Sequence, residues 1–219
     1  MVNGLLRLLT IMLVLTSFAW AKQSAVAEPV QFADPQLAAC VEANLVESNT
    51  KQLHLLEKLK CHGKGIERLD GLESLTQLQY LSLFNNKLKA VDVSGLTQLT
   101  YLNLANNRLQ SVKLHGLQQL ETLYLFKNKL THVDFNGLSR LKKLRITNNQ
   151  LKGIDISELI SLEQGYFFDN QLEDLDLSGL ANLSFIELRQ NPMPDEVYDR
   201  YDAIEGITIV HDGNADDWK

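Results

Sequence analysis

The sequence predicts a solenoid of stacked repeats, with a curved parallel β-sheet on its concave face and short extended segments on its convex face. Three observations support this fold class. First, an asparagine recurs every 21 residues. Second, in the residues before each asparagine, apolar residues that point inward alternate with residues that point outward. Third, each of these stretches is preceded by leucines spaced three residues apart. The recurring asparagines are Asn86, Asn107, Asn128, Asn149, Asn170 and Asn191. Self-similarity at a fixed step of this size is typical of a chain built from one repeated unit.

Each repeat is expected to contribute one short strand. In the first central repeat Leu81 and Leu83 alternate with outward residues, as the period of two along a strand requires. Leu75 and Leu78 fill the space between that strand and the returning backbone. The asparagine then turns the chain, and its amide can pair with buried backbone groups of neighbouring coils. We therefore expect the asparagines to form a ladder of side-chain hydrogen bonds.

A second apolar pair follows each asparagine, as with Val91 and Val93 in the first central repeat. Apolar residues one apart predict a short extended segment on the convex side. A helix would need more residues than a unit of 21 leaves available. One inward position departs from the pattern, because Gly165 stands where the other repeats have leucine or isoleucine. We expect this glycine to leave room for Phe167.

The N-terminal end of the solenoid is predicted to be closed by a helix that starts at Asp34 and Pro35, an N-cap residue followed by proline at the first helical position. The apolar face of this helix is expected to cover the open first coil. That face consists of Leu37, Cys40, Val41 and Leu45. Cys61 falls at an inward position of the first strand, so Cys40 and Cys61 are predicted to form a disulfide. The alternative is two buried free thiols, while a metal pair is disfavoured because no histidine has ligand spacing.

The C-terminal end is predicted to be a second cap. Pro194 and the acidic residues after it start a short helix, which Gly206 ends. Ile207 and Ile209 lie 21 residues beyond Ile186 and Leu188, so they are predicted to form the last strand in the same register. The acidic tail after it protects that edge from pairing with other chains. This makes eight strands in all.

The N-terminus predicts export. Arg7 precedes an apolar run that ends in small residues, which is typical of a secretory signal cleaved after Ala21 or after Ala27. An uncleaved membrane anchor is the alternative, although the run is short for a spanning helix. No later stretch is apolar enough to span a membrane. The predicted organisation is a signal peptide at 1–21, a linker at 22–33, a helical cap at 34–58, repeats at 59–193, and a cap with an acidic tail at 194–219.

The pattern LxxLxLxxNxL is the signature of leucine-rich repeats. With its VDVSGL continuation it resembles the internalin-type bacterial repeats, and most of all the J-type internalins with their LDVS segments. The likeness covers about Asp34 to Val210, including the cap helix with its cysteine. Internalins are surface or secreted interaction modules, so the resemblance implies binding, and not catalysis.

Outward strand positions are the candidate binding site, and eight of the eighteen in the central repeats are aromatic. Exposed aromatic area of this extent usually marks a binding surface. The predicted contact residues are Tyr80, Phe84, Tyr101, Asn103, Tyr124, Phe126, Lys143, Arg145, Tyr166, Phe168 and Phe185. Phe84, Phe126 and Phe168 recur in every second repeat, which predicts rings about 10 Å apart. Lys127, Lys143 and Arg145 place positive charge in the middle of the face and favour an acidic partner.

We therefore predict a monomeric, secreted or periplasmic module that binds a protein through its concave face. The alternatives are a glycan- or peptidoglycan-binding envelope protein, and aromatic residues retained only for strand propensity. The net charge is -6, and the loss of Arg7 with the signal makes it -6 - 1 = -7, which disfavours nucleic acid. No catalytic arrangement and no cofactor site is predicted. The column of Asp92, Asp134, Asp155 and Asp176 is either solvated or a weak site for a divalent cation.

Overall fold

The computed structural model describes residues 30–213. Residues 31–213 belong to one compact unit. The predicted signal peptide, both candidate cleavage sites and most of the predicted linker lie outside the described residues, as does the acidic tail after Gly213.

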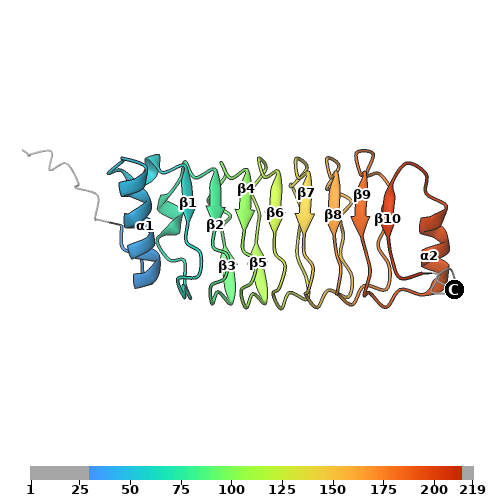
Figure 1. Ribbon diagram of the computed structural model, residues 1–219. Coiled ribbons are helices and arrows are strands. Elements are labelled where there is room, and N and C mark those ends of the chain that lie inside the picture. Colours follow the sequence, from blue (N-terminus) through green and yellow to red (C-terminus); the bar gives the residue numbers. More distant parts are fainter. Residues whose placement is uncertain (1–29, 214–219) are drawn as a thin grey trace, which may run out of the picture. The chain divides into compact units, whose positions relative to one another are not determined.

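The unit is a parallel β-solenoid whose main sheet has eight strands, as the repeats predicted. The strands lie side by side in chain order from one helix to the other (Figure 1). They are β1 Lys58–Lys60, β2 Tyr80–Ser82, β4 Tyr101–Asn103, β6 Thr122–Tyr124, β7 Lys143–Arg145, β8 Gln164–Tyr166, β9 Phe185–Glu187 and β10 Thr208–Val210. The outer surface of this sheet, predicted above as the concave face, is called the strand face below.

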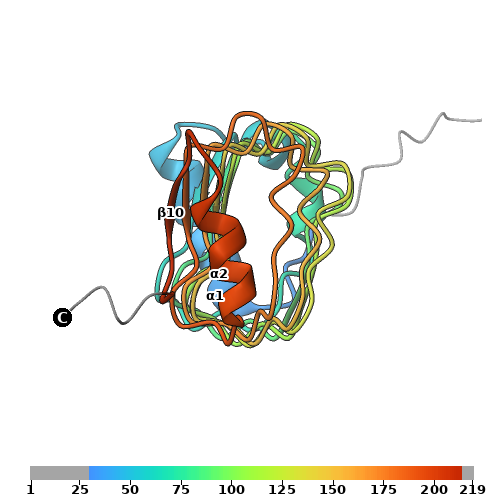
Figure 2. The same ribbon diagram turned by 90° about the vertical axis from the view of Figure 1, so that its right-hand side faces the viewer.

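The step of 21 residues sets the register between strands. Leu81 pairs with Leu102, and Leu102 with Leu123, so inward leucines stack directly on one another with no exposed surface. Seen along the axis, successive coils superpose around a shared interior (Figure 2), which these side chains fill. The convex segments are not helical, as predicted, and two of them, β3 Ala90–Asp92 and β5 Ser111–Lys113, are strands that pair as a small parallel sheet.

The first coil is closed by helix α1, Pro35–Glu47, followed by the short 3-10 helix η1, Leu53–Leu55. A second 3-10 helix, η2, Leu72–Ser74, lies in the next coil. The disulfide between Cys40 and Cys61 is present, which confirms the predicted pairing and joins α1 to the first strand. The Asn44 side chain extends the sheet, because its Oδ1 accepts from the Lys60 N–H at 3.1 Å and its Nδ2 donates to the Lys60 carbonyl at 3.3 Å. Asn44 thus takes the place of a coil that would precede β1.

Asp34 holds both the helix and the coil beneath it. One carboxylate oxygen accepts from the N–H groups of Gln36 and Leu37, at 2.9 and 3.2 Å, and the other from Glu67 and Arg68, at 2.7 and 3.2 Å. Burial alone would raise the pKa of Asp34, but these four backbone donors together lower it below its ordinary value of 3.8.

The lowered pKa predicts acid sensitivity at this cap. The folded state favours ionised Asp34, so its contribution is complete above pH 3.8 and is lost as the pH falls below that value. Asp34→Asn keeps a capping oxygen but turns an amide NH₂ towards two N–H groups, and we expect it to cost about 1–3 kcal/mol at pH 7. Chemical unfolding from pH 7 to pH 2 should give two curves that converge at low pH. A constant difference between them would contradict this role for the carboxylate.

The last coil is closed by helix α2, Asp195–Asp202, which lies across the end of the stack (Figure 2). Two details of the prediction were wrong. The helix ends at Asp202, and Gly206, at φ 83°, instead makes the turn into β10. Ile209, rather than Ile207, pairs with Ile186, because the turn lengthens the step to 209 - 186 = 23 residues. A slip of two residues preserves which side chains point inward.

Tyr201 of α2 pairs with the backbone of the final convex segment. Its hydroxyl donates to the Leu175 carbonyl at 2.8 Å and accepts from the Leu175 N–H at 3.0 Å. Burial first, and then the nearby charge of Asp174, raise the pKa of Tyr201 to about 12. The phenol therefore remains protonated and able to donate at any physiological pH.

Removing this hydroxyl should loosen the C-terminal cap. Tyr201→Phe leaves the buried Leu175 carbonyl without its partner, whereas the Leu175 N–H keeps its bond to the Asp174 carboxylate at 2.6 Å, and we expect a loss of about 1–2 kcal/mol in the free energy of unfolding. Hydrogen exchange should show faster exchange at Leu175 and in β10 while the central strands are unchanged. Tyr198→Phe is the comparison, because the bond from the Tyr198 hydroxyl to the Asn191 carbonyl is longer, at 3.3 Å. Equal effects of the two changes would contradict the argument.

Candidate protein-binding surface

The six recurring asparagines fix the edge of the strand face. Each Oδ1 accepts a backbone N–H from the preceding coil, and each Nδ2 donates to carbonyls of its own and the preceding coil. In Asn149, for example, Oδ1 lies 3.0 Å from the Leu130 nitrogen, while Nδ2 lies 3.1 Å from the Leu125 oxygen and 3.0 Å from the Ile146 oxygen. Buried backbone groups are thereby paired where the coils turn.

All eight predicted aromatic residues lie at outward positions of the strand face, on or directly after β2, β4, β6, β8 and β9, and all are half-buried. Asn103 is also half-buried, and its Oδ1 accepts from the Ala105 N–H at 3.0 Å. Lys143 and Arg145 lie on β7 between the aromatic strands. The predicted residues therefore share one surface, and their binding role stays a prediction.

Five of the rings form one connected group, called the large aromatic cluster, which consists of Tyr80, Phe84, Tyr101, Tyr124 and Phe126. Tyr80 and Tyr101 stack in parallel with centroids 4.2 Å apart, and Tyr101 meets Tyr124 edge to face at 5.7 Å. Burial first, and then a hydrogen bond with Tyr80, raise the pKa of Tyr101. The rings are thus packed against one another and not separately solvated.

One predicted spacing was wrong. Phe84 and Phe126 have ring centroids 6.3 Å apart, not about 10 Å. The residue between them is Ala105, which is small and fully buried, so the two rings lean towards each other over it. The surface is consequently more continuous than strand spacing alone predicts.

Strand β7 separates the large cluster from a second ring pair, Tyr166 and Phe185, whose centroids are 5.2 Å apart. The two cations of β7 each contact one of these two groups of rings. The Arg145 guanidinium lies 4.6 Å from the Phe126 centroid, and the Lys143 ammonium lies 5.5 Å from that of Tyr166. Such cation–π contacts orient the cations without neutralising their charge.

Sequence reasoning missed three residues of the surface: Lys58, Lys60 and His62, on or directly after β1. Both lysines lie over the Tyr80 ring, at 5.1 and 5.7 Å, and His62 meets Phe84 edge to face at 6.0 Å. Burial first, and then the charge of Lys60, lower the pKa of His62. The sequence contained a signal for them, because Leu59 lies 22 residues before Leu81 and is its equivalent in the first strand. The residues that alternate with Leu59 therefore belong to the outward columns.

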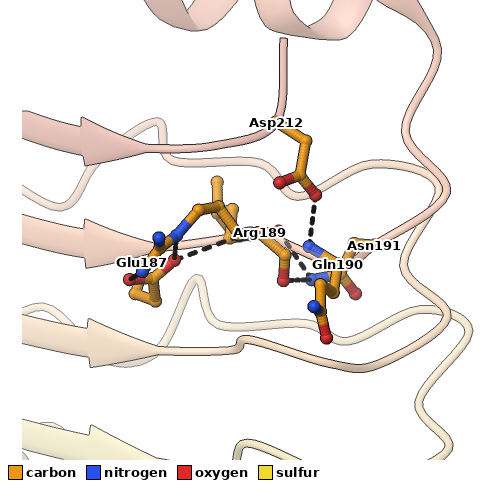
Figure 3. A network of polar contacts seen from close by, with 6 residues as sticks. Glu187, Arg189, Gln190, Asn191 and Asp212 are labelled. Carbon is orange, nitrogen blue, oxygen red and sulfur yellow. Dashed lines mark hydrogen bonds and ion pairs between the residues drawn. The ribbon is translucent and has the colours of Figure 1, made fainter. Parts of the chain in front are cut away.

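At the other end of the face the charges are paired locally (Figure 3). Arg189 forms a two-pronged ion pair with Glu187, with both contacts at 2.8 Å. Asp212 accepts from the Gln190 N–H, a group that donates to a carbonyl of the following coil in the inner repeats, as with Asn148 and Phe168. The Asp212 carboxylate, which belongs to the coil of β10, therefore takes the place of the backbone carbonyl that the following coil supplies in the inner repeats.

The convex carboxylates are used in turns. Asp92, Asp134, Asp155 and Asp176 each accept the N–H of the residue two positions later. Within residues 30–213 there is no group of three or more His, Cys, Asp or Glu side chains placed to hold a metal ion. The same residues include no helix with the length and apolar character that crossing a bilayer requires.

Comparison with known proteins gives the fold. A family model described as leucine rich repeat matches residues 97–151. Internalin C2 of Listeria monocytogenes superposes with a TM-score of 0.53 at 24% identity, over 82% of this chain and 94% of that chain. The protein has an internalin-type leucine-rich repeat fold. InlF of the same organism has a TM-score of 0.54 at 23% identity, over 82% and 64% of the two chains.

A third internalin structure is the functional domain of InlJ from Listeria monocytogenes, which is described as including a cysteine ladder. It has a TM-score of 0.47 at 21% identity, over 83% of this chain and 60% of that chain. The chain thus spans less than two thirds of the InlJ and InlF structures. Both cysteines of the present chain are in the Cys40–Cys61 disulfide. No curated protein matches the sequence.

Proposed function

We propose that this protein is an exported, non-catalytic module that binds another protein through its strand face, outside the cell or in the periplasm. The observation that carries the proposal is the large aromatic cluster, because half-buried rings gathered on one rigid sheet provide apolar area that a partner would cover. Export is supported by the apolar run after Arg7 and by the disulfide, which is typical of oxidising compartments.

A protein partner is favoured over a sugar by the way the rings pack. A sugar ring stacks on an open aromatic face. Tyr80 is stacked on Tyr101 and also lies within cation–π distance of Lys58, so its faces are already occupied. A partner with protruding apolar side chains can instead pack along the edges of such a cluster.

Site-specific photo-crosslinking tests the proposal. A benzoyl-phenylalanine at Phe168 is expected to capture a protein in the native envelope, while the same group at His115, an exposed convex residue, should not. Adding Tyr124→Ala and Phe126→Ala to the first variant should abolish the capture. Equal capture from both positions would exclude the strand face as the binding surface. A product whose size falls with glycosidase, and whose digest contains peptides of the present chain alone, would favour the glycan alternative.

A further inference from the structure

The part of the strand face from β1 to β7 has a charge pattern opposite to that of the whole chain. The protein has 27 Asp and Glu against 21 Lys and Arg. The outward positions on and directly after β1, β2, β4, β6 and β7 nevertheless contain no Asp or Glu, and they include Lys58, Lys60, Lys143 and Arg145. This part of the face therefore has a local excess of positive charge.

These four cations are not neutralised within the described part of the chain. No ion pair among residues 30–213 involves them. Their charged groups instead make cation–π contacts with the rings of Tyr80, Phe126 and Tyr166. Arg189, farther along the same face, is paired with Glu187 and so offers no free charge. Among the outward strand positions, the available positive charge thus lies at the two borders of the large aromatic cluster.

The spacing of the two borders specifies a ligand geometry. Between β1 and β7 there are four strand-to-strand steps, which amount to about 19 Å at about 4.8 Å per step. An extended peptide covers that distance with about six residues. The five rings of the cluster lie between the borders and offer apolar contact, whereas a simple polyanion would be matched by an unbroken row of cations.

We infer that this part of the strand face binds an extended acidic protein segment, with carboxylates at Lys60 and Arg145 and apolar side chains against the rings between them. The inference rests on the proposed function and specifies the chemistry of its partner. Carboxylates recover favourable charge contacts with cations that have none, and the apolar side chains remove the exposed ring edges from water.

Peptide selection on the purified chain tests this inference. From a displayed library of random 12-residue peptides, the enriched sequences are expected to carry net negative charge, with acidic residues about six apart and aromatic or aliphatic residues between them. Their affinity for Lys60→Glu/Arg145→Glu should fall about 10-fold or more. The control is Lys51→Glu/Lys152→Glu, which makes the same change in net charge at exposed residues outside the strand face and should alter affinity less than about 2-fold.

The outcomes separate this inference from the proposed function. Neutral or basic peptides whose binding requires Tyr124 and Phe126 would overturn the acidic partner and leave the strand face as a binding surface. Equal losses in the two charge-reversal variants would also overturn it, since only net charge would then matter. Polyglutamate binding as tightly as the selected peptides would refute the apolar part. Peptides unaffected by Tyr124→Ala/Phe126→Ala would count against both proposals.

Discussion

Replacing Asn149 by alanine is expected to lower the free energy of unfolding by about 2–3 kcal/mol, because the buried Leu130 N–H loses its partner and two buried carbonyls each lose one of their two side-chain donors. Its Oδ1 accepts the Leu130 N–H, and its Nδ2 donates to the carbonyls of Leu125 and Ile146. The side chain is only 8% exposed, so water has little access to the broken contacts. The loss also falls in the middle of the stack, where neither cap can compensate.

Urea unfolding followed by circular dichroism measures this effect. Gln150→Ala is the matched control, since Gln150 is exposed and the hydrogen bond recorded for it uses its backbone N–H. It should change stability by less than about 0.5 kcal/mol. A loss below about 1 kcal/mol for Asn149→Ala would mean that the ladder contributes little to holding the coils together.

Restoring the repeat consensus at Gly165 is expected to destabilise the protein by about 2–3 kcal/mol, although leucine is the usual residue at this position. A Cβ on residue 165 would lie 2.7 Å from Cε2 of Phe167 and 3.5 Å from Cγ1 of Ile186. Phe167 is fully buried and occupies the space that two aliphatic side chains share in the other repeats. Gly165→Leu therefore overfills the core at β8.

A double-mutant cycle distinguishes this steric cause from a general intolerance of substitution. Phe167→Leu alone should cost about 1–2 kcal/mol through the cavity it leaves. Gly165→Leu/Phe167→Leu should lie within about 1 kcal/mol of the wild type, which gives a favourable coupling of at least 2 kcal/mol. Additive losses would show that the glycine is needed for its backbone and not for the space it leaves.

Most of the fold follows from the sequence because one spacing repeats. The asparagines at steps of 21 residues set the register of the central strands, and Gly165 with Phe167 could be read as a size exchange within that register. Prediction failed where the repetition stops. At β10 the preceding turn adds two residues to the step, and no periodic signal records its length.

The candidate site was predicted less completely than the fold. Periodicity placed the aromatic residues on one face, but it could not specify that Phe84 and Phe126 lean together over Ala105, since this depends on side-chain rotamers. Lys60 was overlooked as a member of the face because β1 lies beside the cap and precedes the first asparagine of the series. Charge at the border of the cluster became apparent only when the strands were aligned in space.

The side chains of Asn44 and Asp212 each satisfy, at opposite ends, a backbone group that an inner repeat would bond to its neighbour. The two ends of the stack are therefore closed by residues near the termini, whatever the number of repeats between them. Duplication or deletion of whole repeats during evolution could therefore change the length of the solenoid without any change in the residues that close its ends.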